Sequence, residues 1–215
     1  MNNRRYFVTL IGVTIILAAA SVLIGQDAGN AALKNPAVLK EMAPAVFKVN
    51  FDTSAGMFEV EVHRDWSPNG ADRFYNLVKI GYYDDTAFFR IVNGFMAQIG
   101  IHGDSEVNAK WRPATIADDP SAGQSNKPGY VTFAKTGMPN SRTTQIFFNF
   151  GDNAGLDGQG FTPFGKVVEG APVLGALNLE YGEAPDQGAI QSQGNAYLRA
   201  NFPRLDYVKT ARLVP

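Results

Sequence analysis

The sequence predicts a mainly β domain in which short antiparallel strands close into a barrel capped by two helices. Several short segments alternate apolar and polar residues with a period of two, the pattern of strands with one buried face. Two segments, 67–81 and 171–179, repeat their apolar residues at helical spacing instead. Many short strands with few helices are typical of a closed barrel, because closure removes exposed strand edges.

The first two strands are expected on either side of residues 53–56. Apolar residues alternate with polar ones in segment 47–51 and again in segment 58–62. The residues between them, Thr-Ser-Ala-Gly, are typical of a turn. This pattern predicts an antiparallel hairpin with one solvated face.

A helix is expected to begin after Ser67 and to end before Gly81. Ser67 offers an N-cap hydroxyl, and Pro68 suits the first helical position. The apolar residues at 71, 74, 77 and 78 then follow at helical spacing. This helix would cover one end of the sheet.

Residues 88–100 contain two short apolar runs separated by Asn93-Gly94, which is a strong hairpin signal. A hairpin here would place Arg90 and Gln98 close together among apolar side chains. A guanidinium beside an apolar pocket can bind a peptide carbonyl. This segment is therefore the first candidate for a functional site.

The remaining elements are assigned from shorter patterns. Residues 103–128 are polar and rich in Gly, Ser, Asn, Asp and Pro, and a loop of this length is expected to carry function or to line a site. We find no internal repeat and no second domain. The further elements are expected to be strands at 130–134, 145–150, 164–168 and 206–214, a short helix at 171–179 and an extra helix at 189–202.

The N-terminus predicts export. Arg4 and Arg5 precede an uncharged stretch, and the small residues 18–21 fit the cleavage site of a signal peptide. The apolar residues 6–24 are equally just long enough to span a bilayer uncleaved, and so could attach the chain to a membrane. Both alternatives place the rest of the chain in the periplasm or another extracytoplasmic compartment. The predicted regions are a signal peptide or anchor at 1–26, a linker at 27–45 and a folded domain at 46–215.

Composition excludes several classes of function. The chain has a formal net charge of −1 and no basic cluster, so a nucleic-acid partner is not expected. Cys is absent, which excludes disulfides and thiolate nucleophiles. The two histidines, His63 and His102, are expected to be solvated, and the acid pairs at 84–85 and 118–119 to be turn or solvated residues. No metal or other cofactor is therefore expected, and the chain is expected to be a monomer.

Three blocks of the sequence resemble the cyclophilin family of peptidyl-prolyl isomerases. Residues 88–98, Phe-Phe-Arg-Ile-Val-Asn-Gly-Phe-Met-Ala-Gln, resemble the signature F-H-R-x-x-x-G-F-M-x-Q. Residues 144–148 are similar to S-Q-F-F-I, and residues 156–167 to L-D-G…F-G-K-V. The resemblance extends over residues 46–214 and implies an eight-stranded antiparallel barrel with two capping helices. It also implies isomerisation of X-Pro bonds in folding proteins.

The resemblance implies a role for nine residues of this chain. Arg90 matches the catalytic arginine, and Gln98 and Gln145 match the polar groups that hold the substrate backbone. Ala134 matches a small residue beside the pocket for the preceding residue, and Phe161 takes the place of a pocket histidine. The wall of the proline pocket is matched by Phe95, Met96, Phe147 and Leu156.

These residues suit a reaction in which no covalent bond breaks. Rotation of an X-Pro bond meets a barrier of ~20 kcal/mol because amide resonance is lost. Arg90 could donate to the proline nitrogen, which regains its lone pair in the twisted amide, while Gln98 supports Arg90 and binds the peptide carbonyl. The partners are then proline-containing polypeptides.

One alternative stays open. Three positions depart from the family pattern: Phe89 replaces a histidine, Lys135 an asparagine and Gly155 an aromatic residue. Phe89, Gly155 and Phe161 change the rim of the pocket. They therefore leave open a non-catalytic module or scaffold that binds proline peptides without accelerating their isomerisation.

Overall fold

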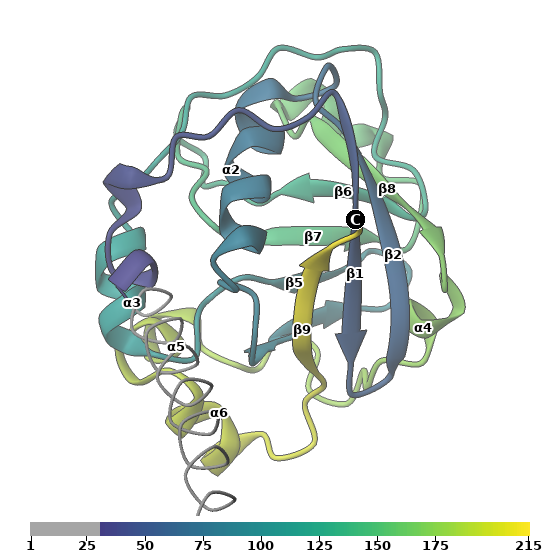
Figure 1. Cartoon of the computed structure of the whole chain (residues 1–215). Helices are drawn as coiled ribbons and strands as arrows, with labels where there is room; N and C mark the ends of the chain where they lie inside the picture. Colours follow the sequence, from purple (N-terminus) through teal and green to yellow (C-terminus); the bar gives the residue numbers. More distant parts are fainter. Residues whose placement is uncertain (1–30) are drawn as a thin grey trace, which may run out of the picture.

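The strands of the computed structural model form one curled antiparallel sheet (Figure 1). The structure describes residues 31–215, so the predictions for 1–26 and the start of the linker lie outside the described residues. Among the described helices, none is both long and apolar enough to cross a membrane. The mainly β fold with helices around it agrees with the sequence prediction.

The number of strands and the closure of the barrel differ from that prediction. The described part of the chain has nine strands in the order β3-β9-β1-β2-β8-β6-β7-β5-β4, and every pair is antiparallel. The end strands do not pair with each other; two residues, Phe88 and Phe89, join them along the chain. The strands are β1 (Val46–Thr53), β2 (Gly56–His63), β3 (Thr86–Ala87), β4 (Arg90–Val92), β5 (Met96–Ile99), β6 (Tyr130–Phe133), β7 (Ile146–Asn149), β8 (Pro163–Glu169) and β9 (Tyr207–Leu213).

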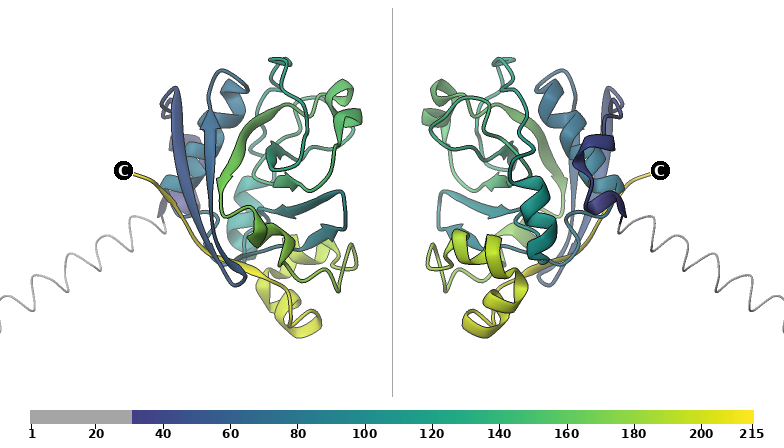
Figure 2. Two further views of the ribbon diagram at one scale, coloured as in Figure 1. Left: turned by 90° about the vertical axis from the view of Figure 1, so that its right-hand side faces the viewer. Right: turned by 90° about the vertical axis from the view of Figure 1, so that its left-hand side faces the viewer.

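The sheet curls around a core of aromatic side chains. In side view, the strands of the N-terminal hairpin and the strands coloured teal lie on opposite sides of the domain (Figure 2). Phe51 and Phe58 face each other across the β1–β2 hairpin, with ring centroids 5.0 Å apart. Phe148 of β7 packs edge-on against both rings. The core thus packs the β1–β2 hairpin against β7, which carries one of the three matched sequence blocks.

Helix α2 (Pro68–Lys79) confirms the prediction for 67–81, but its N-terminal cap is different. The Ser67 hydroxyl makes no capping bond and donates to Asp119 instead. The Asp119 carboxylate accepts hydrogen bonds from the N–H groups of Asn69 and Gly70, so a residue from a distant loop caps the helix. The prediction that Asp119 is a turn or solvated acid is therefore wrong, because the side chain is only 6% exposed and satisfies a helix end.

The other acids and the two histidines discussed in the sequence analysis lie in different environments. Asp84 and Asp85 lie in a turn at the surface, where they pair with arginines of β9 and α6. His63 is not simply solvated, because its ring stacks on Trp66 with centroids 4.1 Å apart. His102 is half-buried beside Tyr82, and burial lowers its pKa from the usual value.

The remaining helices differ most from the sequence prediction. The polar stretch 103–128 is not one loop, since it contains α3 (Ser105–Trp111), which Asp104 caps by accepting from the Glu106 N–H. The segment 171–179 forms only the short helix α4 (Pro172–Gly175). The extra helix at 189–202 is two helices, because Gly194 adopts φ = 59° and ends the first of them. These two are α5 (Gln187–Gln193) and α6 (Asn195–Asn201), and short 3₁₀ turns lie at Pro36–Val38 and Ala154–Gln159.

The described part of the predicted linker, residues 31–45, lies against the domain. The Trp111 indole Nε1 donates to the carbonyl of Leu33 at 2.7 Å, which attaches this segment to α3 (Figure 1). Further along, Asn76 of α2 exchanges hydrogen bonds with the backbone of Glu41. From residue 31 onward, this segment therefore follows the surface of the domain.

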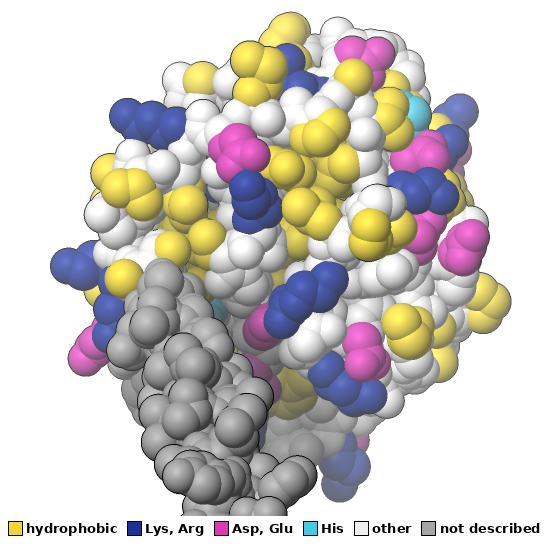
Figure 3. Space-filling view, in the orientation of Figure 1, with side chains coloured by type: hydrophobic (Ala, Val, Ile, Leu, Met, Phe, Trp, Pro, Cys, Tyr) yellow, Lys and Arg dark blue, Asp and Glu magenta, His cyan; other side chains and the backbone are white. Residues whose placement is uncertain are grey.

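The charges on the face seen in Figure 1 are mixed in sign. Lys and Arg side chains alternate with Asp and Glu side chains on this face, and neither kind forms a continuous patch (Figure 3). Among the described residues, opposite charges also form close ion pairs, such as Arg212 with Asp84 at 2.7 Å and Lys79 with Glu41 at 2.5 Å. Exposed pairs of this kind contribute little stability each.

Candidate active site

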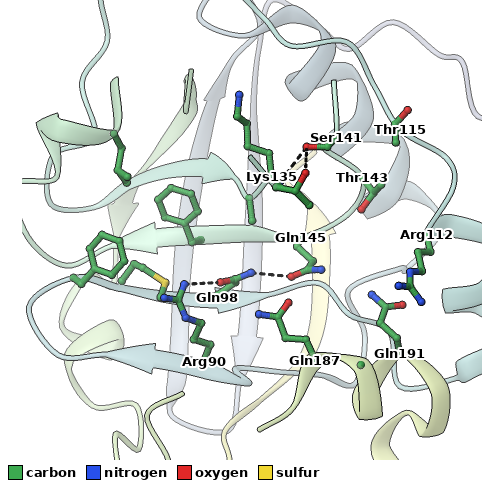
Figure 4. Close-up of a pocket in the computed structure, with 17 residues that line it drawn as sticks. Arg90, Gln98, Arg112, Thr115, Lys135, Ser141, Thr143, Gln145, Gln187 and Gln191 are labelled. Atoms are coloured by element: carbon green, nitrogen blue, oxygen red, sulfur yellow. Dashed lines mark hydrogen bonds between the residues drawn. The ribbon is translucent and has the colours of Figure 1, made fainter. Parts of the chain in front are cut away.

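A pocket of about 510 Å³ lies over β5 and β7, beside the β4–β5 hairpin and helix α5 (Figure 4). Eight of the nine residues predicted for the site line it, and Phe161 does not. The pocket therefore brings together side chains that the three matched sequence blocks supply. It also has lining residues that lie outside those blocks, which are described below.

Strand register places the polar side chains of the site. Arg90 on β4 pairs directly with Gln98 on β5, and Gln98 pairs with Phe147 on β7. Side chains at directly paired positions of neighbouring strands project from the same face of a sheet. The turn that permits this register contains Gly94 with φ = 70°, a backbone conformation that favours glycine.

Hydrogen bonds connect these side chains in a row across the sheet. The Arg90 Nη1 donates to Gln98 Oε1 at 3.2 Å, and Gln98 Nε2 donates to Gln145 Oε1 at 2.8 Å (Figure 4). On its other edge, Arg90 Nε donates to Glu183 at 2.6 Å. Gln98 can accept from Arg90 only with its oxygen toward the guanidinium, so the row determines the orientation of each amide.

Apolar side chains form the wall next to this row. Met96 and Phe147 are almost fully buried, whereas Phe95 and Leu156 are half-buried at the rim. The Arg90 guanidinium carbon lies 6.0 Å from the centre of the Phe95 ring. A cation thus stands beside an apolar recess of the kind that holds a small ring.

Phe161 lies behind this wall. Its ring packs edge-on against Phe147, with centroids 6.0 Å apart and planes at 70°. The ammonium of Lys135 lies 5.7 Å from the centre of the Phe161 ring and also 3.3 Å from Asp118. Phe161 therefore supports Phe147 from outside the pocket, whereas Lys135 lines the pocket itself.

The other half of the pocket is polar, and the sequence analysis anticipated it only through the stretch 103–128, which was expected to carry function or to line a site. Arg112 and Thr115 come from the segment after α3, while Thr143 precedes the strand β7. Gln187 and Gln191 project from α5 (Figure 4). Among the described residues that line the pocket, three are cationic and none is acidic. No motif identified the individual residues of this half, since they come from loops and from a helix without a motif.

A buried ion pair holds the loops of the polar half in place. Arg142, 2% exposed, donates to Asp119 at 2.9 Å and also to the Ser67 hydroxyl and the Ala117 carbonyl. Burial opposes ionisation of Asp119, but hydrogen bonds from Ser67 and from helix N–H groups, together with the charge of Arg142, lower its pKa below the usual value. Segments 112–119 and 135–143 are thereby fastened to α2.

Neither histidine lines the pocket. Within residues 31–215, no group of three or more His, Asp or Glu side chains could hold a metal ion. Arg90 and the two glutamines can donate and accept hydrogen bonds, but they cannot exchange protons near neutral pH. The site can therefore bind and polarise a peptide group.

Comparisons with known proteins agree with this chemistry. The model of the cyclophilin-type peptidyl-prolyl cis-trans isomerases matches residues 48–193. A peptidyl-prolyl cis-trans isomerase of Acinetobacter baylyi is 33% identical over 130 residues, which cover 59% of this chain and 69% of the relative. Peptidyl-prolyl cis-trans isomerase B of Escherichia coli is 31% identical over 133 residues, 59% of this chain and 80% of the relative.

Solved structures show the same fold. A Cryptosporidium parvum cyclophilin superimposes with a TM-score of 0.57 at 21% identity, covering 79% of this chain and 98% of the other. A cyclophilin from Hirschia baltica gives a TM-score of 0.55 at 20% identity, covering 80% and 75%. The fold and the site together define a small protein with one curled antiparallel sheet and a pocket that has an apolar and a polar half. The chain belongs to the cyclophilin-type peptidyl-prolyl cis-trans isomerases, as the three sequence blocks implied.

Proposed function

We propose that the pocket holds the proline of an X-Pro segment in an unfolded polypeptide and that Arg90 and Gln98 accelerate rotation of its peptide bond. The observation that carries this proposal is the hydrogen-bonded row Arg90–Gln98–Gln145 beside the apolar recess. A dipeptide Ala-Pro was present when a second structure of the Cryptosporidium parvum cyclophilin was determined. A proline ring suits the apolar recess, and the peptide group beside it suits the cation at the edge, Arg90.

The proposed mechanism favours the twisted amide over the planar one. As the X-Pro bond rotates, the proline nitrogen becomes pyramidal and its lone pair becomes available to a donor. The guanidinium of Arg90 stays charged at all relevant pH values and can donate to that nitrogen. Phe95, Met96 and Phe147 would hold the ring and exclude water, which strengthens the donation.

The amide side chains have a separate task. Gln98 is fixed by its bonds to Arg90 and Gln145, and Gln145 keeps donors for a substrate carbonyl. Gln145 would hold the peptide backbone on one side of the rotating bond, while the apolar recess holds the proline ring on the other side. Because no proton is transferred, the lack of an acid or base in the lining does not prevent this reaction.

The proposal is tested by a proline-limited peptide assay on the wild type and Arg90→Ala. Loss of a donor aimed at the transition state lowers kcat/KM by about 100-fold. Arg199→Ala is the matched control, since it removes an exposed arginine of α6 that pairs with Asp85 outside the pocket. Equal activity of Arg90→Ala and the wild type would overturn the role of Arg90.

The same assay addresses the alternative of a non-catalytic proline-peptide module. That alternative predicts binding of a proline peptide, measured by calorimetry, with no acceleration of its isomerisation. The three residues that motivated it, Phe89, Gly155 and Phe161, do not line the pocket. Phe89 is fully buried among apolar side chains that include Ile190 of α5 and Leu198 of α6. Isomerisation is therefore the function that this geometry supports best.

We also propose that this isomerase acts outside the cytoplasm on exported polypeptides. The support is the sequence of residues 1–26, with two arginines before an apolar stretch. Fractionation of cells that express the full chain, followed by N-terminal sequencing, distinguishes cleavage near Ala20 from attachment through 6–24. Recovery of an uncleaved chain in the cytoplasmic fraction would contradict export.

A further inference from the structure

The guanidinium of Arg90 has a second partner, Glu183, which lies outside the three matched sequence blocks. Glu183 Oε1 accepts from Arg90 Nε at 2.6 Å and lies 2.5 Å from Nη2. Gln98 occupies one N–H of Nη1 on the opposite side. A guanidinium has five N–H donors, so these contacts leave one N–H on each terminal nitrogen. The free donors lie on the edge that Glu183 does not occupy.

The segment that carries Glu183 is attached to the strand that carries Arg90. The carbonyl of Gly182 accepts from the N–H of Ile91 at 3.0 Å, which uses a donor on the outer edge of β4. Ala184 N–H donates to the carbonyl of Tyr181 at 2.9 Å and closes a turn around Glu183. The carboxylate is thus presented by a backbone that is fixed on both sides, and β4, as an end strand, has this edge available for it.

The segment that carries Glu183 continues into helix α5, which reaches the pocket. Asp186 caps the helix by accepting from the Ala189 N–H at 2.7 Å. The helix then places Gln187 and Gln191 on the wall of the pocket (Figure 4). One continuous segment, 180–193, therefore contacts the guanidinium at one end and lines the pocket at the other.

We propose that Glu183 is a positioning residue that holds the Nε edge of Arg90 so that its two free N–H groups face the bound X-Pro segment. This inference rests on the proposed function of Arg90. Arg90 is 31% exposed and Glu183 59%, so the pair itself adds little to folding stability. Its effect lies in orientation, because Gln98 alone contacts one nitrogen and leaves the guanidinium free to turn toward solvent.

The test combines kinetics with an NMR signature of the guanidinium. We expect Glu183→Ala to lower kcat by about five-fold with little change in KM, since substrate contacts remain while the donor is misaligned. Glu183→Gln keeps an oxygen acceptor at the same reach and is expected to restore activity to within about two-fold of the wild type. The Arg90 Nε–H signal should exchange slowly with solvent in the wild type and in Glu183→Gln, and fast in Glu183→Ala.

Glu180→Ala is the matched control for the charge. Glu180 lies three residues earlier in the same segment and pairs with Arg204 rather than with Arg90. Its removal should change neither kcat nor the Arg90 Nε–H exchange. Thermal unfolding of all variants verifies that the segment stays folded.

Two results would overturn the inference: wild-type kcat in Glu183→Ala, or fast exchange of the Arg90 Nε–H in the wild type. Failure of the proposed function gives a different result, which is full activity of Arg90→Ala. The exchange measurement does not depend on activity, so it still decides whether Glu183 orients the guanidinium.

Discussion

The two halves of the pocket are held in place by different means. In the apolar half, Arg90, Gln98 and Phe147 stand on neighbouring strands, and backbone ladders set their spacing. In the polar half, the lining comes from α5 and from segments between strands, which one isolated β-bridge between Ile116 and Arg142 joins. There the buried pair of Asp119 and Arg142 takes the place of strand register.

This difference explains what each half can tolerate. A side chain on a central strand can be exchanged without moving the backbone that carries it, because both edges of the strand are hydrogen-bonded. The loops of the polar half are held mainly by side-chain contacts, namely the Asp119–Arg142 pair and the hydrogen bonds from Arg73 to the carbonyls of Ala114 and Thr143. Loss of one of these contacts can therefore shift the backbone of a loop. We therefore expect changes in the apolar half to affect catalysis first and changes under the polar half to affect folding first.

The largest effect is expected from Asp119→Ala, which tests whether one carboxylate holds the polar half. The substitution leaves the buried Arg142 with only the more distant Asp118, 3.4 Å from its Nε, as a charge partner. It also leaves the N–H groups of Asn69 and Gly70 without an acceptor. Breaking a buried pair in this way costs about 3–5 kcal/mol of the free energy of unfolding, measured by urea denaturation. The control is Asp52→Ala, which removes a surface partner of Lys209. If Asp119→Ala lowers the free energy of unfolding no more than this control does, Asp119 does not hold the polar half in place.

The same carboxylate predicts a dependence of stability on pH. The folded-state pKa of Asp119 is lowered, whereas the unfolded chain has the usual value of ~3.9. Its contribution is therefore fully present above pH ~4 and is lost as the pH falls through the lowered folded pKa. The difference in unfolding free energy between the wild type and Asp119→Asn should shrink between about pH 5 and pH 2. A constant difference over this range would show that the charge of Asp119 contributes nothing.

Much of the fold could be predicted from the sequence because strands leave a local signal. The β1–β2 hairpin, α2 and the β4–β5 hairpin follow from period, turn residues and caps that lie within a few positions of each other. Strand β3 has only two residues, too few for a period, and α3 has only two turns within a polar stretch. The division of 189–202 depends on the φ of Gly194, for which the helical pattern gives no indication.

The residues of the candidate site likewise fall into those that the sequence could predict and those that it could not. Eight of its lining residues could be named in advance from the resemblance to the cyclophilin family, and the structure brings them together. Seven of them lie in the three matched blocks, and the eighth is Ala134. Gln187 and Gln191 could not be named, because their approach to Arg112 depends on how α5 packs beside α3. The cap of α2 by Asp119 was also missed, since the two are fifty residues apart and only tertiary structure joins them.

Phe95→Ala tests the apolar half with the next largest effect. The Phe95 backbone is held by hydrogen bonds with Val92, Phe150 and Asn153, so the loop should keep its shape without the ring. Removal of one wall of the recess is expected to lower kcat/KM by about ten-fold, the equivalent of ~1.4 kcal/mol of lost apolar contact. Tyr75→Ala, a half-buried aromatic outside the pocket, should leave kcat/KM unchanged. If Phe95→Ala alters the unfolding free energy more than it alters kcat/KM, the ring belongs to the core and not to the recess.

The smallest effect is expected from the double variant Gln187→Ala and Gln191→Ala, which asks whether the polar half contacts substrate at all. Gln191 lines the pocket, and its Oε1 is buried without a hydrogen-bond partner among the described residues. A turn of this amide toward the pocket would let the oxygen accept a substrate N–H. Both side chains lie across the pocket from the apolar recess, which predicts a rise in KM of about three-fold for long peptides and none for a peptide that ends beside the proline. Gln193→Ala, on the same helix but outside the lining, is the control. An equal rise for long and short peptides would mean that α5 acts on the site through Glu183 and Arg90 rather than through contact with the substrate.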